Sequence, residues 1–162
     1  MHRLLIIVGL TLMLAACDNG REARANMDAA TVFLGKNAKA PGVMRLPSGV
    51  QYKIVASGPA DGPHPGPADE VKVNYEGKLL SGKVFDSSFA RGEPANFPLG
   101  GLIPAWVEAL QRMRPGDEWI LYVPPAMGYG EKESGPIPPN SVLIFRIQLL
   151  GVLRHPGGTQ LG

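Results

Sequence analysis

The 162-residue sequence contains a single cysteine, Cys17, so no disulfide can form within the chain. The stretch 71–145 contains no histidine and no cysteine, which excludes a Ser–His or Cys–His nucleophile and a cluster of metal ligands there. We therefore expect no metal and no cofactor. Sixteen basic and fourteen acidic residues are interspersed along the chain. Because they form no basic stripe, binding to nucleic acid is not expected.

A long apolar run is also missing. Residues 4–14 are apolar except for Gly9 and Thr11, but a helix that spans a membrane needs about 20 such residues. A positive start at His2 and Arg3 and small residues at 15 and 16 make residues 1–16 typical of an export signal.

The motif Leu14-Ala15-Ala16-Cys17 resembles the lipobox of bacterial lipoproteins, in which the cysteine receives a diacylglyceryl group. Cys17 is thus the predicted lipidation site, and residues 17–42 are predicted to be a lipidated tether with a short helix. Secretion with an unmodified thiol is the alternative. Asp18 resembles an inner-membrane retention signal of enteric bacteria, so we expect a periplasm-facing lipoprotein at the inner rather than the outer membrane.

Glycine and proline are abundant, with 21 and 16 residues, which favours turns and β-structure. Residues 26–39 have apolar side chains at helical spacing, with Asn26 as the expected N-cap. Alternating or apolar runs predict strands at 49–55, 70–80, 83–86, 118–123 and 141–150, and a helix is predicted at 104–113. The expected fold class is α+β: an antiparallel, curved sheet of five to six strands wrapped around one short helix, with a short N-terminal helix.

Residues 43–150 resemble the FK506-binding type of peptidyl-prolyl cis/trans isomerase. Single pieces would be weak signals, but many occur in order: VKVNYEG at 71–77, FDSS at 85–88, FPL at 97–99, LIPAW at 102–106, YG at 129–130, IPPNS at 137–141 and LIF at 143–145. Residues 41–52 resemble the subgroup typified by the macrophage infectivity potentiator. One departure is Ala105, where the family usually has glycine before the pocket tryptophan.

The resemblance implies a site without covalent chemistry. It assigns catalytic roles to Asp86, Tyr129 and Trp106, with Trp106 beneath the prolyl ring. It implies a substrate-binding set made of Tyr75, Phe85, Arg91, Phe97, Leu102, Ile103, Ile137 and Phe145. The Ile103 N–H and the Tyr129 hydroxyl are the implied donors to substrate carbonyls. Without the resemblance, Trp106 is more typical of an ordinary core residue, and the phenylalanines also fit a core. Residues 86–88 fit a turn in which the carboxylate caps backbone N–H groups.

The implied function is isomerisation of Xaa-Pro bonds in unfolded or nascent exported polypeptides, with binding of FK506- or rapamycin-like ligands. The domain is predicted to span 43–153, followed by a disordered tail at 154–162. Relatives in the subgroup dimerise through a long helical arm that is shortened here, so a monomer is expected. A membrane-tethered chaperone or adaptor that binds unfolded segments with little turnover is the alternative, favoured by Ala105.

Overall fold

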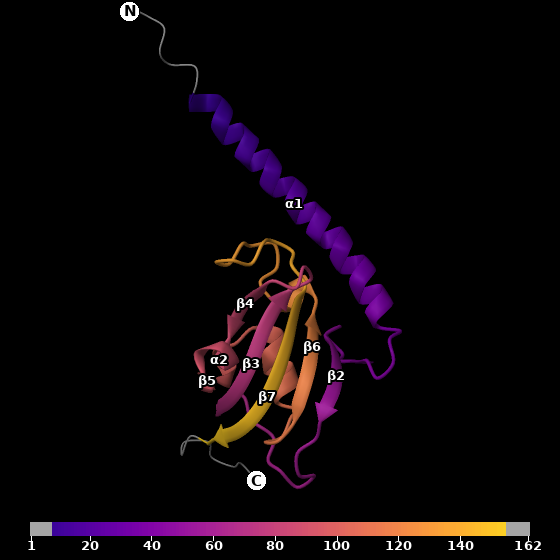
Figure 1. The fold of residues 1–162 in the computed structure, drawn as a ribbon, viewed down its shortest axis with the longest axis vertical. Helices are drawn as coiled ribbons and strands as arrows, with labels where there is room; N and C mark the ends of the chain where they lie inside the picture. Colours follow the sequence, from indigo (N-terminus) through magenta and orange to yellow (C-terminus); the bar gives the residue numbers. More distant parts are fainter. Residues whose placement is uncertain (1–7, 155–162) are drawn as a thin grey trace, which may run out of the picture.

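The computed structural model describes the backbone of residues 8–154 and the side chains of residues 20–154. Its centre is one curved antiparallel sheet (Figure 1) with the strand order β1-β2-β6-β7-β3-β4, and β5 pairs with β3. The strands are β1 (Met44–Arg45), β2 (Gln51–Ala56), β3 (Glu70–Leu79), β4 (Val84–Ser87), β5 (Ala95–Pro98), β6 (Glu118–Val123) and β7 (Leu143–Leu153). The antiparallel α+β class is confirmed, and the sheet has seven strands rather than five to six. The two that the sequence did not predict are β1 and β5.

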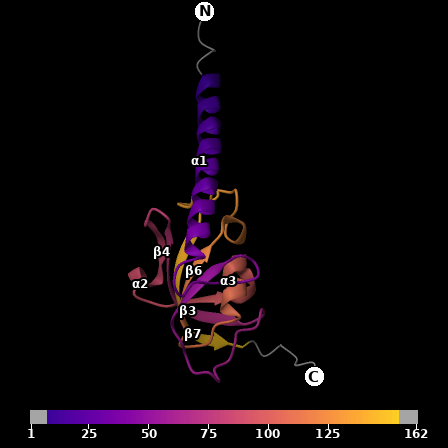
Figure 2. The ribbon, with the colours of Figure 1, turned by 90° about the vertical axis from the view of Figure 1, so that its right-hand side faces the viewer.

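Buried and less buried side chains alternate along the central strands β3 and β6, so one face of the sheet is covered by the core. Val71, Val73 and Tyr75 on β3 are buried on one face, and Trp119, Leu121 and Val123 on β6 are buried on the same side. These residues pack against α3 (Pro104–Leu110), which lies across this face (Figure 2). The predicted central helix is confirmed and ends earlier than expected, at Leu110. Register shifts in β2 and β3 bend the sheet around it.

The N-terminal helix is longer than predicted. Helix α1 (Val8–Asn37) has 30 residues and passes through Asn26 without interruption, so Asn26 is not an N-cap. The polar residues at 18–24 had suggested a tether before the helix, but arginine, glutamate and alanine are strong helix formers. The predicted signal peptide lies partly in residues 1–7, and the predicted tail almost wholly in 155–162. Both ranges fall outside the described residues, as does the side chain of Cys17.

The C-terminal part of α1 packs against the sheet of the same chain. The Phe33 ring lies 6.0 Å from the ring of Tyr122, on the sheet face opposite α3. Gln51 on β2 joins the end of the helix through two hydrogen bonds: its Nε2 donates to the Leu34 carbonyl at 2.8 Å, and its Oε1 accepts from Asn37 at 2.9 Å. Among the helices of residues 8–154, none is both long and apolar enough to cross a membrane.

Candidate active site

A cleft of about 200 Å³ opens where α3 meets the inner face of the sheet. Trp106 lies at its base, in the first turn of α3, and only 4% of its surface is exposed. Pro104 starts this helix at a position where its missing N–H costs no hydrogen bond. The buried indole N–H of Trp106 has no hydrogen-bond partner among the described residues. Packing alone therefore holds the indole in place.

Three aromatic rings stand edge-on to the indole. The ring centroids of Phe145, Tyr75 and Phe97 lie 5.2, 5.3 and 6.1 Å from it, with interplanar angles of 84°, 83° and 80°. Such T-shaped pairs place the positive edge of one ring against the negative face of another. The indole and these three rings together line the apolar part of the cleft.

Gly77 makes this aromatic packing possible. It pairs with Phe145 of β7 on one side and with Asp86, next to Phe85, on the other. A Cβ atom at this position would lie 2.6 Å from Cζ of Phe85 and 2.7 Å from Cε1 of Phe145. The rings of Phe85 and Phe145 meet at 89° with centroids 5.6 Å apart. Any side chain at residue 77 would force these rings apart.

One charged group lies at the edge of the cleft. The Asp86 carboxylate accepts hydrogen bonds from the Tyr75 hydroxyl and, at 2.5 Å, from Arg91. The guanidinium of Arg91 also donates to the Tyr75 hydroxyl at 3.0 Å and lies 5.6 Å from the centre of the Tyr75 ring. The three side chains therefore form a closed network beside the apolar surface.

The network changes the pKa of each member. Burial opposes ionisation of Asp86, but the hydrogen bonds from Tyr75 and Arg91 outweigh it and lower the pKa of Asp86 below its ordinary value of 3.8. Burial and the bond to Asp86 raise the pKa of Tyr75, so its hydroxyl stays protonated. Asp86 is thus a fixed anion near neutral pH, which suits an electrostatic role better than proton transfer.

The short helix α2 (Ser88–Arg91) brings Arg91 to the carboxylate. Ser87 caps its first turn by accepting from the Ala90 N–H, and Gly92 ends it in the left-handed conformation. The sequence reasoning allowed a turn capped by the Asp86 carboxylate; the capping group is instead the Ser87 hydroxyl. The structure also shows a residue that the prediction missed: buried Ser88 accepts the Tyr75 N–H at 2.8 Å. The only sequence feature that pointed to Ser88 was its place as the second serine of the FDSS motif at 85–88.

Two hydrogen-bond donors border the cleft. Leu102, Ile103 and Tyr129 line it, and Tyr129 is 41% exposed. In the described part of the chain, neither the Ile103 N–H nor the Tyr129 hydroxyl donates to another protein group. Both donors are therefore available to a ligand that lies on the indole.

The structure brings most of the predicted site residues together. Nine line the cleft: Tyr75, Phe85, Asp86, Phe97, Leu102, Ile103, Trp106, Tyr129 and Phe145. Arg91 reaches it through its bonds to Asp86 and Tyr75. Ile137 differs, because it exchanges two backbone hydrogen bonds with Ser134 and packs into the core without lining the cleft. Its role in substrate binding stays a prediction.

Comparison with known proteins gives a consistent result. The family model described as "FKBP-type peptidyl-prolyl cis-trans isomerase" matches residues 62–150, and the "Domain amino terminal to FKBP-type peptidyl-prolyl isomerase" matches residues 13–54. The chain is similar to the peptidyl-prolyl cis-trans isomerase Mip of Coxiella burnetii, with 49% identity over 128 residues, 78% of this chain and 55% of that one. It is 44% identical to the outer membrane protein MIP of Legionella longbeachae over 85% of this chain and 58% of that one.

The crystal structure of FkpA from Escherichia coli has a similar fold. The TM-score is 0.82 at 35% identity, covering 94% of this chain and 75% of that chain. The chain spans 55–58% of the length of the two curated relatives named above.

Proposed function

The chain belongs to the FKBP-type peptidyl-prolyl cis-trans isomerase family, and we propose that it catalyses rotation about Xaa-Pro bonds in unfolded or nascent exported polypeptides. The observation that carries this proposal is the apolar cleft with Trp106 at its base and one fixed carboxylate at its edge. The reaction forms no bond to the enzyme, so an apolar surface with hydrogen-bond donors beside it is sufficient for it.

Amide resonance sets the barrier to rotation at about 18–20 kcal/mol, so the uncatalysed reaction takes tens to hundreds of seconds and can limit folding. In the twisted transition state the nitrogen has lost conjugation and the carbonyl is less dipolar. Water solvates the planar amide better than the twisted one, whereas an apolar surface does not. Each preference of about 1.4 kcal/mol for the twisted form accelerates the reaction about tenfold.

The residues around the cleft then have separate tasks. The prolyl ring lies on Trp106, with Tyr75, Phe97 and Phe145 around it. The Ile103 N–H and the Tyr129 hydroxyl donate to carbonyls of the substrate and hold the chain on either side of the rotating bond. Asp86 holds the Tyr75 hydroxyl and supplies a negative potential at the rim.

A protease-coupled assay on an Xaa-Pro peptide, with and without FK506, tests this proposal. We expect accelerated isomerisation that the inhibitor abolishes, and a marked loss of turnover in Tyr129→Phe, which deletes one donor and keeps the ring. The alternative function, capture of unfolded segments with little turnover, predicts binding of FK506 but no acceleration. The Ala105 methyl, which is fully buried at the start of α3, is the feature that favours this alternative.

We also propose that a lipid on Cys17 anchors the protein at the periplasmic side of a membrane, with Asp18 favouring the inner one. The lipobox motif supports this, and one relative is named an outer membrane protein. Cys17→Ser is expected to abolish incorporation of labelled palmitate and to move the protein out of the membrane fraction. Because one acyl chain binds only marginally, firm anchoring requires two or more. Equal labelling of Cys17→Ser would contradict the proposal.

Asp18→Ser serves as the matched variant of the adjacent residue. It should keep the lipid label and shift the protein from the inner to the outer membrane in a density gradient.

We further expect a monomer in sedimentation, because the partly buried face of α1, with Ala30 and Phe33, packs on the chain's own domain.

A further inference from the structure

Helix α1 is joined to the domain at a second point, about two to three turns before the contacts of its C-terminal end at Phe33 and Asn37. Asn26 Nδ2 on the helix donates to the Pro139 carbonyl at 2.8 Å. In the reverse direction, Asn140 Nδ2 donates to the Ala23 carbonyl of the helix at 3.0 Å. Each asparagine therefore binds the main chain of the segment that carries the other. We call this pair of bonds the asparagine clamp.

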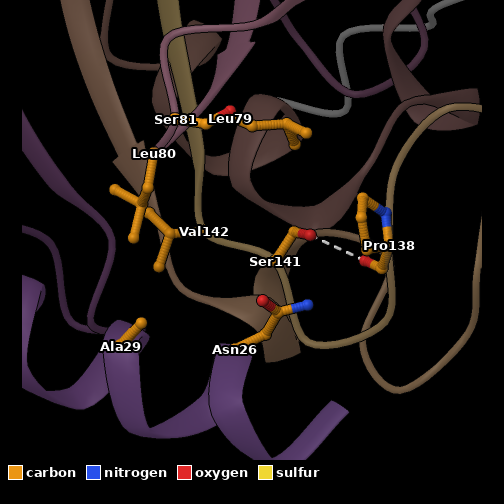
Figure 3. Close-up of a pocket in the computed structure, with 8 residues that line it drawn as sticks. All are labelled: Asn26, Ala29, Leu79, Leu80, Ser81, Pro138, Ser141 and Val142. Carbon is orange, nitrogen blue, oxygen red and sulfur yellow. Dashed lines mark hydrogen bonds between the residues drawn. The ribbon is translucent and has the colours of Figure 1, made fainter. Parts of the chain in front are cut away.

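A gap lies beside the clamp. A second cleft of about 260 Å³ lies between α1 and the domain (Figure 3), lined by Asn26, Ala29, Leu79, Leu80, Ser81, Pro138, Ser141 and Val142. Figure 3 shows Asn26 and Ala29 rising from the helix toward Ser141 and Val142 across this space. The two hydrogen bonds of the clamp thus join α1 to the domain at the edge of a gap that apolar side chains do not fill.

Asn140 also connects directly to the active-site segment. Its backbone N–H donates to the carbonyl of Gly130 at 2.8 Å, and Gly130 follows Tyr129 in the chain. Asn140 has a φ of 56°, the left-handed conformation, and no other non-glycine residue in the described range has a positive φ. Its side chain is buried, and its Oδ1 has no hydrogen-bond partner among the described residues. A single residue in the left-handed conformation thus links α1 to the turn that presents the Tyr129 hydroxyl.

We propose that the asparagine clamp positions Tyr129, so that docking of α1 on the domain sets how well the cleft holds its substrate. Asn26 and Asn140 are positioning residues that act through Tyr129 and touch no substrate. This inference rests on the proposed isomerase function for its kinetic consequence, but the mechanical link between α1 and residues 129–140 does not.

Hydrogen exchange on the full chain tests the link without reference to activity. Asn26→Ala and Asn140→Asp each remove one donor of the clamp, and aspartate tolerates the left-handed conformation. Loss of one hydrogen bond corresponds to about a fivefold change in an opening equilibrium. We therefore expect the amide of Gly130 to exchange about fivefold faster in both variants, and the amide of Asn140 to do so in Asn26→Ala. Asn37→Ala is the matched control, because it removes one side-chain bond at the other end of the docked segment. It should leave both amides unchanged.

A double-mutant cycle tests the consequence for the site. Asn26→Ala should lower kcat/KM about threefold to fivefold in the wild-type background and leave it unchanged in the Tyr129→Phe background, since the lost hydroxyl can no longer be displaced. Equal losses in both backgrounds, or unchanged exchange at Gly130 and Asn140, would overturn the proposal. If the parent chain shows no isomerisation at all, the proposed function fails, while the exchange experiment still decides on the clamp.

Discussion

Asp86→Asn is expected to lower kcat/KM for an Xaa-Pro peptide by about tenfold while the domain stays folded. Asparagine has the same shape but carries no charge, so Arg91 loses its ion pair and the Tyr75 hydroxyl loses a charged acceptor. A hydrogen bond to a charged group contributes about 1.5–3 kcal/mol, and the 42% exposure of the Asp86 side chain places the loss at the lower end of that range. About 1.4 kcal/mol corresponds to a tenfold change in rate.

The pH profile of the wild type follows from the same network. The pKa of Asp86 is lowered in the folded protein, so its contribution to stability is complete above the pKa of the unfolded chain, about 3.9. That contribution is lost only as the pH falls through the lower folded value. We therefore expect kcat/KM to show no titration of Asp86 between pH 5 and pH 8, and to fall only in strongly acidic solution.

Asp61→Asn is the matched control for the charge change, because Asp61 is an exposed loop residue. It should leave both the rate and the melting temperature unchanged. A wild-type profile that falls between pH 5 and pH 7, or an Asp86→Asn variant with unchanged kcat/KM, would contradict the electrostatic role of the carboxylate.

Gly77→Ala is expected to lower the free energy of unfolding by about 1–3 kcal/mol and to weaken FK506 binding at least tenfold. Overpacking of a core costs about this much because rings and backbone must move. Here the new methyl would press on Phe85 and Phe145, and both rings line the cleft. The same substitution therefore reduces both stability and the fit of the site, as measured by urea unfolding and calorimetric titration.

Gly151→Ala separates this effect from the general cost of replacing a strand glycine. Gly151 also lies in the sheet, on β7, but a Cβ there would meet only the Cβ of Lys72 at 3.9 Å, an ordinary contact. We expect its unfolding free energy to stay within about 1 kcal/mol of the wild type and its FK506 affinity to be unchanged. Tight FK506 binding by Gly77→Ala would show that these rings do not shape the cleft.

Period-2 alternation and turn residues predicted the central sheet well, because β3 and β6 are each buried on one face. Strand β5 was missed since it has only four residues, ends in Pro98 and pairs with β3 alone. Helix α1 was predicted too short because the polar residues at 18–24 have no apolar stripe and were interpreted as a tether. The helix propensity of the arginine, glutamate and alanine among them was the better guide.

The candidate active site could not be predicted from local sequence patterns in the way that the sheet could. Its lining comes from segments between Tyr75 and Phe145 that the fold brings together, and local patterns cannot distinguish a ring that lines a cleft from a core ring. Nine of the residues that the family resemblance implied line one cleft in the structure, whereas Ile137 is not among the residues that line it. Contacts such as Asn140 with Ala23, 117 residues apart, have no local signal at all.

The most direct test of the apolar-cleft mechanism is the rate of exchange between the cis and trans signals of a prolyl peptide at equilibrium, measured by NMR with catalytic amounts of the protein. We predict exchange many times faster than in the peptide alone, at an unchanged cis/trans ratio, and its disappearance when FK506 occupies the cleft. Peptide signals that shift or broaden through binding while cis–trans exchange stays at the uncatalysed rate would contradict catalysis by this site.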